Sequence, residues 1–271
     1  MSDIKEEQLV EAACRQRFLE TCELSGVSDP HRQTIWEIII SHYSAGNRHY
    51  HNLAHLMCMF DFVKRASKAG IALVDAAAVE WAVWFHDIVY TPCSKSNEAD
   101  SAELAGKLLL AAGVPAATVQ KAQRIILATA DHHHLEGDAD GDVVVDADLS
   151  ILGAPLPRYA EYAVAVRKEY GHLSDEEYTQ GRARVLKGLL DREQLFLTDI
   201  GKATCEAAAR ANMGHEWRLV FGGSQLSAST IEEADTECTE GDDVAASVSS
   251  IGPDSAAELA AAADAVQCEC R

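Results

Sequence analysis

Basic residues are scarce in this 271-residue sequence, where 23 lysines and arginines stand against 43 aspartates and glutamates. The formal net charge at pH 7 is −20. Proteins that bind nucleic acid or anionic membranes neutralise phosphates with clustered lysines and arginines, and no such cluster occurs here. We therefore expect neither partner. A small anionic substrate needs only a few basic side chains in one pocket, so that class of ligand stays open.

Long apolar runs are also absent. None approaches the roughly 20 residues that a membrane-spanning helix requires. The N-terminal residues are acidic where a signal peptide has a basic region followed by an apolar one. The eight cysteines include no CxxC pair, and we expect reduced thiols at the scattered Cys14, Cys22, Cys58, Cys93 and Cys205. These features predict a cytoplasmic protein.

No stretch shows the alternation of apolar and polar residues, with β-branched enrichment, that is typical of strands. From residue 3 to about residue 220, apolar residues instead recur with a helical period and are separated by short helix-stop signals. We therefore predict an all-α fold. The expected helices cover a first segment ending at Gly26 and the ranges 31–43, 52–69, 75–90, 97–113, 115–130, 158–171, 175–192 and 205–220.

The composition changes after residue 222 to Ser, Ala, Glu, Asp and Thr. About half of the net negative charge lies in this last fifth of the chain. A segment so acidic and so poor in large apolar residues cannot bury enough surface to fold alone. We predict a helical domain over residues 1–222 and a disordered acidic tail over residues 223–271, and the tail is a candidate binding element for a protein partner.

One apolar run contains an unexpected pair. The stretch "AVWFHDIVY" places His86 and Asp87 among Trp84, Phe85 and Ile88, which a helix would bury. A buried carboxylate costs several kcal/mol unless it is paired or binds a metal ion. The rest of the chain has to supply the partner.

Three other stretches offer one. In "RHYHNLAHL", His51 and His55 are one helical turn apart, and His55 falls on the inward face. A helix ends in the triple histidine of "ILATADHHH", and "VVVDADLSILG" places two aspartates between apolar runs. Each stretch alone has an ordinary explanation, such as a core histidine or a helix cap. Together they favour a shared centre for a divalent metal ion, which could be Fe, Mn, Co, Zn or Mg.

The order His…His-Asp…Asp on a helical chain resembles the HD-domain metal-dependent phosphohydrolases. "YHNLAH" at residues 50–55 and "ADLS" at residues 147–150 resemble motifs of the cyclic-nucleotide phosphodiesterases in that superfamily. From Arg48 to about Asn212 the chain is also similar to a group of predicted HD phosphohydrolases, through "RHYHNLAHL", "WFHDIVY", "NEADSA", "DADLSILG", "RKEY" and "AARANM".

The resemblance implies an HD-type helical bundle that holds one or two metal ions. The implied ligands are His55, His86, Asp87 and Asp148. It also implies that His51 is the general acid, and Asp87 is the second catalytic candidate. Asp146 competes with Asp148 as the ligand, since the two lie two residues apart and point in different directions. His132 and His133 are candidates for a second metal ion, although the triple histidine is equally explained as an exposed helix end.

Other residues are candidates for supporting roles. Arg48, Arg182 and Arg210 are candidate substrate-binding cations, and structural pairing of Arg182 or Arg210 with Glu169 or Glu216 is the alternative. Glu98 and Asn52 are candidates for orienting a ligand histidine or a water from behind the metal ligands. Helix capping by Asn97, with Glu98 in the first turn, explains "NEADSAE" as well.

The expected function is hydrolysis of a small phosphate ester by a metal-activated water, with a nucleotide as the favoured substrate. Two alternatives come from other classes. A di-iron oxygenase on the same fold would need extra histidines such as His132 or His133, and a non-catalytic protein would use the metal ion as a structural staple.

Overall fold

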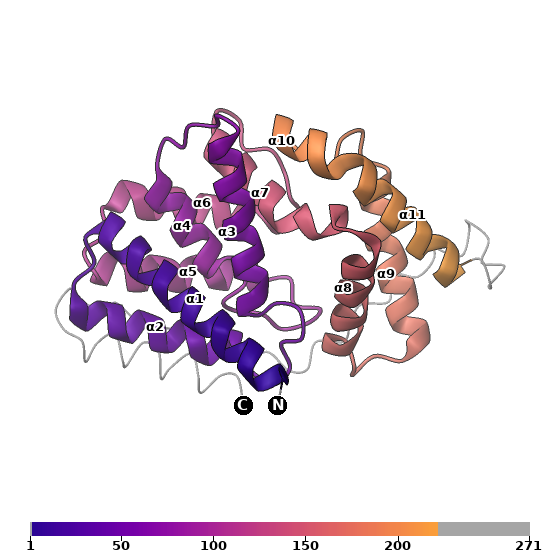
Figure 1. The fold of residues 1–271 in the computed structure, drawn as a ribbon, viewed down its shortest axis with the longest axis horizontal. Helices are drawn as coiled ribbons and strands as arrows, with labels where there is room; N and C mark the ends of the chain where they lie inside the picture. The colour runs from indigo at the N-terminus through magenta and orange to yellow at the C-terminus, as the bar shows by residue number, and fades with distance from the viewer. Residues whose placement is uncertain (1, 222–271) are drawn as a thin grey trace. The chain divides into compact units, whose positions relative to one another are not determined.

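The computed structural model describes residues 2–221, and the elements that it contains are helices, with no strand in this range (Figure 1). The prediction of an all-α fold is confirmed. The acidic tail over residues 223–271 lies outside the described residues. The element order is α1 (Ser2–Ser25), α2 (Asp29–Tyr43), α3 (Leu53–Lys68), α4 (Ala76–Phe85), α5 (Asn97–Ala111), α6 (Ala116–Ala128), α7 (Ala139–Leu149), the 3₁₀ helix η1 (Ser150–Gly153), α8 (Leu156–Glu169), α9 (Asp175–Leu190), α10 (Asp199–Gly201), the π-helix η2 (Lys202–Glu206) and α11 (Ala207–Phe221).

The described chain divides into two compact units. The first runs to Ala45 and resumes from Val74 to Ala130, so it holds α1, α2, α4, α5 and α6. The second covers Gly46–Leu73 and continues from Asp131, so it holds α3 and every element from α7 onward. That residues 1–222 act as one catalytic domain stays a prediction.

Aromatic side chains form the core of the first unit. Phe18 of α1 lies 5.4 Å from Trp36 of α2, and 6.0 and 5.8 Å from Trp81 and Trp84 of α4, measured between ring centroids. Both α4 tryptophans are fully buried, and their indole N–H groups donate to hydroxyls on α1 at 2.8 and 3.0 Å. Buried Trp usually needs such an acceptor. Core packing therefore accounts for both residues.

Helix α4 is apolar on every side because it lies inside this core. All its residues from Ala78 to Phe85 are buried, including Glu80. Burial raises the pKa of the Glu80 carboxyl, while its ion pair with Arg17 and a hydrogen bond from Thr21 oppose this shift. The single acid in the helix is thus tied to α1 by two partners.

Two helices of the second unit pack against each other and carry site residues. Helix α3 begins after Asn52, whose side-chain oxygen accepts from the backbone N–H of Ala54 at 2.9 Å and of His55 at 3.4 Å. Its inward face buries His55 together with a row of apolar residues. Helix α7, its neighbour, begins after Asp138, which accepts from Gly141 N–H. Both starts are side-chain caps of the usual kind.

Close backbone contact joins η1 to η2 in the second unit. A Cβ added to Gly153 would lie 2.6 Å from Cβ and 2.7 Å from Cα of Cys205, closer than side-chain carbons approach in proteins. Buried Asn212 of α11 reinforces this junction, since its amide donates to the carbonyls of Leu152 and Ala154 at 2.8 Å each. Only glycine fits at position 153.

Several sequence expectations are wrong in detail. The helix expected over 75–90 ends at Phe85, and the helix expected over 115–130 ends at Ala128. Residues 139–149 form the helix α7, which was not among the helices expected from the sequence. The residues from Val143 to Ala147 are all buried, so this helix shows no alternation of apolar and polar faces in the sequence.

The cysteines agree with expectation at four positions. Cys14, Cys22, Cys58 and Cys205 are free thiols, and burial raises the pKa of Cys14 and of Cys22 to about 12. Cys93 is disulfide-bonded, so the prediction of a reduced thiol is wrong there. Within residues 2–221, no helix has the combination of length and hydropathy that crossing a membrane requires.

The contact at Gly153 gives a stability prediction. Gly153→Ala should lower the free energy of unfolding by about 1–3 kcal/mol, because the added methyl group overlaps the Cys205 backbone. Gly188→Ala on α9 is the control: its Cβ would meet nothing within 4 Å, and alanine favours a helix by about 0.5–1 kcal/mol. Urea unfolding of both variants measures the difference. Equal effects of the two substitutions would contradict the close contact.

Candidate active site

The His-Asp pair lies where α4 ends. Helical hydrogen bonding continues through His86, whose N–H donates to the Ala82 carbonyl at 2.9 Å, and the chain then turns. His86 is completely buried, and Asp87 is 9% exposed. Their neighbours Phe85 and Ile88 are fully buried as well. Burial of these apolar side chains places His86 and Asp87 in the core.

The geometry of His86 calls for a positive charge beside it. Its Nδ1 lies 3.0 Å from the Val83 carbonyl oxygen, which can only accept, so Nδ1 carries a hydrogen. In a neutral imidazole the other nitrogen, Nε2, then presents a lone pair. This Nε2 lies 2.9 Å from a carboxylate oxygen of Asp87. Two acceptors at that distance repel each other unless a proton or a cation balances them.

A second arrangement of this kind lies in the unit that holds α3 and α7. Nε2 of His55 on α3 is 3.2 Å from one carboxylate oxygen of Asp148 on α7. Nε2 of His132, in the turn after α6, is 3.0 Å from the other oxygen. The His55 side chain is 2% exposed and the Asp148 side chain 16%. One carboxylate thus meets two imidazoles in a largely buried position.

The two aspartates of "DADLS" have different surroundings. Asp146 is fully buried and accepts from the backbone N–H groups of Leu197 and Thr198 at 2.7 and 2.8 Å and from the Thr198 hydroxyl at 2.6 Å. Burial raises its pKa, against the effect of these donors. Because residues two apart on a helix point in different directions, Asp146 fastens the 196–198 loop while Asp148 faces the histidines. This difference supports Asp148 over Asp146 as the ligand.

The three histidines at the end of "ILATADHHH" also differ in their surroundings, because each contacts a different carboxylate. They follow α6 instead of lying in it, and His132 adopts a left-handed backbone conformation with φ of 51°. His133 pairs with Asp131, and His134 with Asp142 at 2.8 Å, and both side chains are about half exposed. Of the three, His132 is the residue that meets Asp148.

His51 has a buried carboxylate behind it. Its Nδ1 lies 2.6 Å from Oε2 of Glu169, and the other oxygen of Glu169 accepts from the N–H groups of Tyr50 at 2.7 Å and His51 at 3.0 Å. The Glu169 side chain has no exposed surface. Burial raises the pKa of Glu169, but the His51 ring and the two backbone donors outweigh it and lower the pKa below its ordinary value.

The three candidate arginines have protein partners. Buried Arg48 donates to the His51 carbonyl at 3.1 Å, so it shapes the loop before α3. Arg182 binds Glu216 through two nitrogens, at 2.7 and 2.9 Å, and donates to the Tyr162 hydroxyl at 3.2 Å. Arg210 binds Glu206 and three backbone carbonyls in residues 190–193. These pairs support the structural alternative for Arg182 and Arg210, with Glu216 and Glu206 as partners.

The remaining candidates lie at helix starts. Asn52 caps α3 and donates to the His49 carbonyl at 3.1 Å, which holds the chain just before His55. Glu98 is partly exposed in the first turn of α5. The cap of α5 is Ser96, while Asn97 makes two hydrogen bonds to the backbone of Thr91 at 2.9 and 3.0 Å. A role for Asn52 or Glu98 behind the metal ligands stays a prediction.

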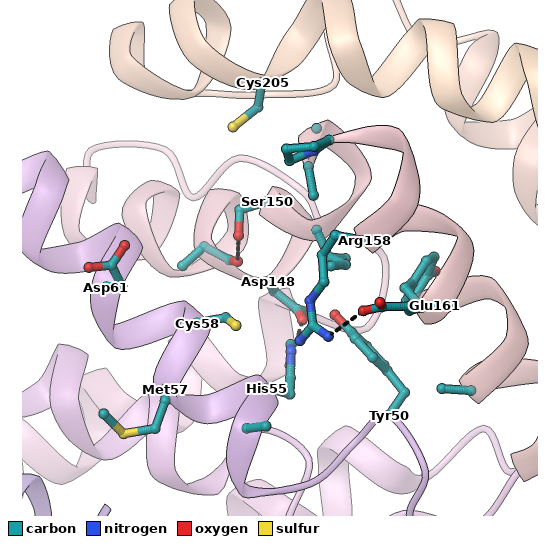
Figure 2. Close-up of a pocket in the computed structure, with 18 of the residues that line it drawn as sticks. Tyr50, His55, Met57, Cys58, Asp61, Asp148, Ser150, Arg158, Glu161 and Cys205 are labelled. Carbon is teal, nitrogen blue, oxygen red and sulfur yellow. Dashed lines mark hydrogen bonds and ion pairs between the residues drawn. The ribbon is translucent and has the colours of Figure 1, made fainter. Parts of the chain in front are cut away.

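A cavity of about 760 Å³ lies in the second unit, with His55 and Asp148 in its lining (Figure 2). Tyr50 and Tyr162 form an aromatic part of the wall, and their ring centroids are 4.6 Å apart. Two arginines line it as well, Arg65 on α3 and Arg158 on α8. The cavity has the size of a site for a small organic molecule.

A scan against models of protein families, a search of curated proteins and a search of solved structures each found no match.

Sequence reasoning missed two features of this site. It gave Glu169 only as a possible partner of the arginines, whereas the residue pairs with His51, 118 positions away. It did not consider Arg158, which lines the cavity. The "RKEY" motif pointed toward Glu169, but nothing local in the sequence marks Arg158.

The Arg182–Glu216 pair gives a pH prediction. Burial raises the pKa of Glu216, but Arg182 and the Tyr159 hydroxyl outweigh it, so the folded-state pKa lies below the ordinary 4.5. The pair therefore contributes its full stability above pH 4.5 and loses it as pH falls through the folded-state pKa. Glu216→Gln leaves the buried Arg182 charge without its carboxylate, and should cost about 3–5 kcal/mol at neutral pH.

Urea unfolding of wild type and Glu216→Gln between pH 7 and pH 3.5 measures this effect. The difference in unfolding free energy should be constant above about pH 5 and should narrow at lower pH. A difference that does not change with pH would show that the carboxylate charge is not what stabilises the pair.

Proposed function

We propose that this chain is a metal-dependent phosphohydrolase of the HD class, which cleaves a small phosphate ester, with a nucleotide as the favoured substrate. His55, His86, Asp87 and Asp148 are the proposed ligands of one divalent metal ion. The observations that carry the proposal are two largely buried imidazole–carboxylate pairs, His86 with Asp87 at 2.9 Å in the first unit and His55 with Asp148 at 3.2 Å in the second.

The donor atoms fit a divalent cation by their chemistry. Two imidazole nitrogens and two carboxylate oxygens form a borderline-to-hard set suited to Fe, Mn, Co, Zn or Mg. Nδ1 of His86 donates to the Val83 carbonyl, so Nε2 is the nitrogen that would bind a metal ion, as in many metal-ligating histidines. A cation also removes the repulsion between the paired imidazole and carboxylate lone pairs. When bound, such an ion supplies a water of lowered pKa and positive charge near the phosphoryl oxygens.

His51 has the surroundings that a general acid needs. The Glu169 carboxylate accepts from its Nδ1–H, which favours the protonated ring and leaves Nε2–H directed elsewhere as a proton donor. The two backbone N–H groups hold Glu169 in place, and the His51 side chain keeps 19% of its surface exposed. We assign His51 as the general acid because its ring is partly exposed while Glu169 stabilises its proton from behind.

The cavity supports a nucleotide-sized substrate. It includes the proposed ligands His55 and Asp148, and its volume of about 760 Å³ exceeds what a phosphate group alone would need. Tyr50 and Tyr162 offer aromatic surface on which a base can stack, an interaction worth about 1–3 kcal/mol per base. A phosphate at the ligands and a ring against the tyrosines would use both parts of the lining.

One observation favours a second candidate, the di-iron oxygenase. His132 lies 3.0 Å from Asp148, so an extra histidine is available for a second metal ion beside the shared carboxylate. The two functions differ in measurable ways. Two iron equivalents with oxygen-dependent turnover support the oxygenase, and phosphate release that needs no oxygen supports the hydrolase.

Metal analysis combined with a phosphate-release assay tests the proposal. Wild type should carry near-stoichiometric metal and release phosphate from members of a nucleoside monophosphate panel. Asp87→Ala and Asp148→Asn should lose the metal and at least 10³-fold in activity, since catalysis passes through one centre. Asp146→Asn, assayed where its circular dichroism shows it folded, should keep the metal. Failure of wild type to bind metal after reconstitution, or full activity after metal removal, would refute the proposal.

The pairing of His51 with Glu169 gives a kinetic prediction. Glu169→Gln removes the negative charge behind His51, so the protonated ring is less favoured. The basic limb of the pH–rate profile should move to lower pH, and kcat at pH 8 should fall about 10- to 100-fold with metal content unchanged. His51→Ala should lower kcat further. A uniform loss at all pH values would show that Glu169 only maintains the loop.

A further inference from the structure

The cavity in the second unit contains few basic groups. Among the residues that the structure describes, its lining includes two arginines, Arg65 and Arg158, and no lysine. Arg182 and Arg210, two of the arginines expected from the sequence to bind substrate, are not among the lining residues and bind carboxylates and carbonyls elsewhere. Besides the proposed metal ion, Arg65 and Arg158 are therefore the groups in this lining that carry a permanent positive charge.

Arg65 is the less available of the two. Its Nε lies 3.3 Å from Asp61 one turn earlier on α3, and its guanidinium carbon lies 5.1 Å from the ring centroid of Phe62. The Phe62 ring is fully buried, so the stacked guanidinium is held against the helix.

Arg158 is more readily released. Its guanidinium donates to Glu161 at 3.0 Å within the first turn of α8, and the two side chains are 52% and 66% exposed. An exposed ion pair of this kind is weak, so an incoming anion can replace Glu161. Figure 2 shows the Arg158 side chain extending toward the side of the cavity where His55 and Asp148 lie.

We infer that Arg158 binds the phosphate or another anionic group of the substrate, and that Glu161 occupies the guanidinium until substrate displaces it. This inference rests on the proposed function, because it assigns the anion-binding residue of the same site. Arginine suits the role because its planar guanidinium binds phosphate oxygens through two parallel hydrogen bonds. The carboxylates of Asp61, Asp148 and Glu161 also line the cavity, so an anion is favoured only next to the guanidinium.

Cys58 provides a reporter for this binding. It is exposed, it is a free thiol in the cavity lining, and it interacts with Arg158, where it contributes, after the Glu161 hydrogen bond, to raising the pKa of the guanidinium. An anion held by Arg158 should shield the thiol. The rate of Cys58 alkylation therefore reports occupancy independently of turnover.

The experiment measures alkylation of Cys58 by iodoacetamide, quantified by peptide mass spectrometry, in the metal-loaded full chain with increasing inorganic phosphate. Phosphate should protect Cys58 in wild type with saturation. Arg158→Gln should raise the half-protecting phosphate concentration at least tenfold, since a charge-assisted hydrogen bond is lost. Glu161→Gln should lower that concentration several-fold, because the competing carboxylate is gone. Both residues are exposed, and melting curves verify that the variants are folded.

Lys187→Gln is the matched control. Lys187 on α9 is 51% exposed, pairs with Asp191 and is absent from the cavity lining, so its replacement changes net charge equally without touching the site. Its protection curve should equal that of wild type. Phosphate that fails to protect wild-type Cys58, or an Arg158→Gln curve that matches wild type, would overturn the inference.

The outcomes separate this inference from the proposed function. If wild type binds metal and releases phosphate but Arg158→Gln has unchanged protection and KM, only the role of Arg158 is refuted. If wild type binds no metal and hydrolyses nothing, the proposed hydrolase is refuted, while Arg158-dependent protection would still establish the anion site.

Discussion

Buried imidazoles that face carboxylates are the constraint on which the site depends. The Val83 carbonyl fixes the hydrogen of His86 on Nδ1. The lone pair of Nε2 therefore faces the Asp87 carboxylate, and the two atoms are 2.9 Å apart. Asp148 faces two imidazoles in the same manner. Such arrangements are costly in a core unless a positive charge balances them, and a divalent cation does so without requiring a buried imidazolium.

Much of the surrounding structure holds these side chains at the right depth. The aromatic core of the first unit buries α4 from Ala78 to Phe85, so the residues that follow its end lie in the interior. In the second unit, Asn52 fixes the start of α3, and Asp146 ties α7 to the 196–198 loop. Glu169 serves the loop before α3 through three hydrogen bonds. Asp146 and Glu169 do not belong to the proposed ligand set, but their hydrogen bonds help to position the helices that carry Asp148 and His55.

The net charge of the whole chain does not predict which charged side chains line the cavity. A net charge of −20 describes the whole sequence, whereas the cavity lining pairs its two arginines with Asp61 and Glu161. Arg182 and Arg210, which the sequence offered as anion binders, are held by Glu216 and Glu206. The Arg158–Glu161 pair is more exposed than the pairs of Arg182 and Arg210, and an exposed ion pair is weaker. We therefore infer that Arg158 is the arginine that can release its partner and bind substrate.

Local pattern was enough to determine the helical class and most helix positions, because helical periodicity and caps involve residues a few positions apart. It also marked His86 and Asp87, since a polar pair inside an apolar run is visible without a structure. The resemblance to HD-domain proteins then named His55, His86, Asp87 and Asp148 as candidate ligands. Pattern failed for α7, where an acidic start and a continuous apolar run hide the period, and for the ends of α4 and α6. Tertiary structure alone decided the partner of His51, the contrasting surroundings of Asp146 and Asp148, and the placement of Arg158 in the cavity. Each of these depends on contacts between helices far apart in the chain, and a single sequence does not record which side chains such packing brings together.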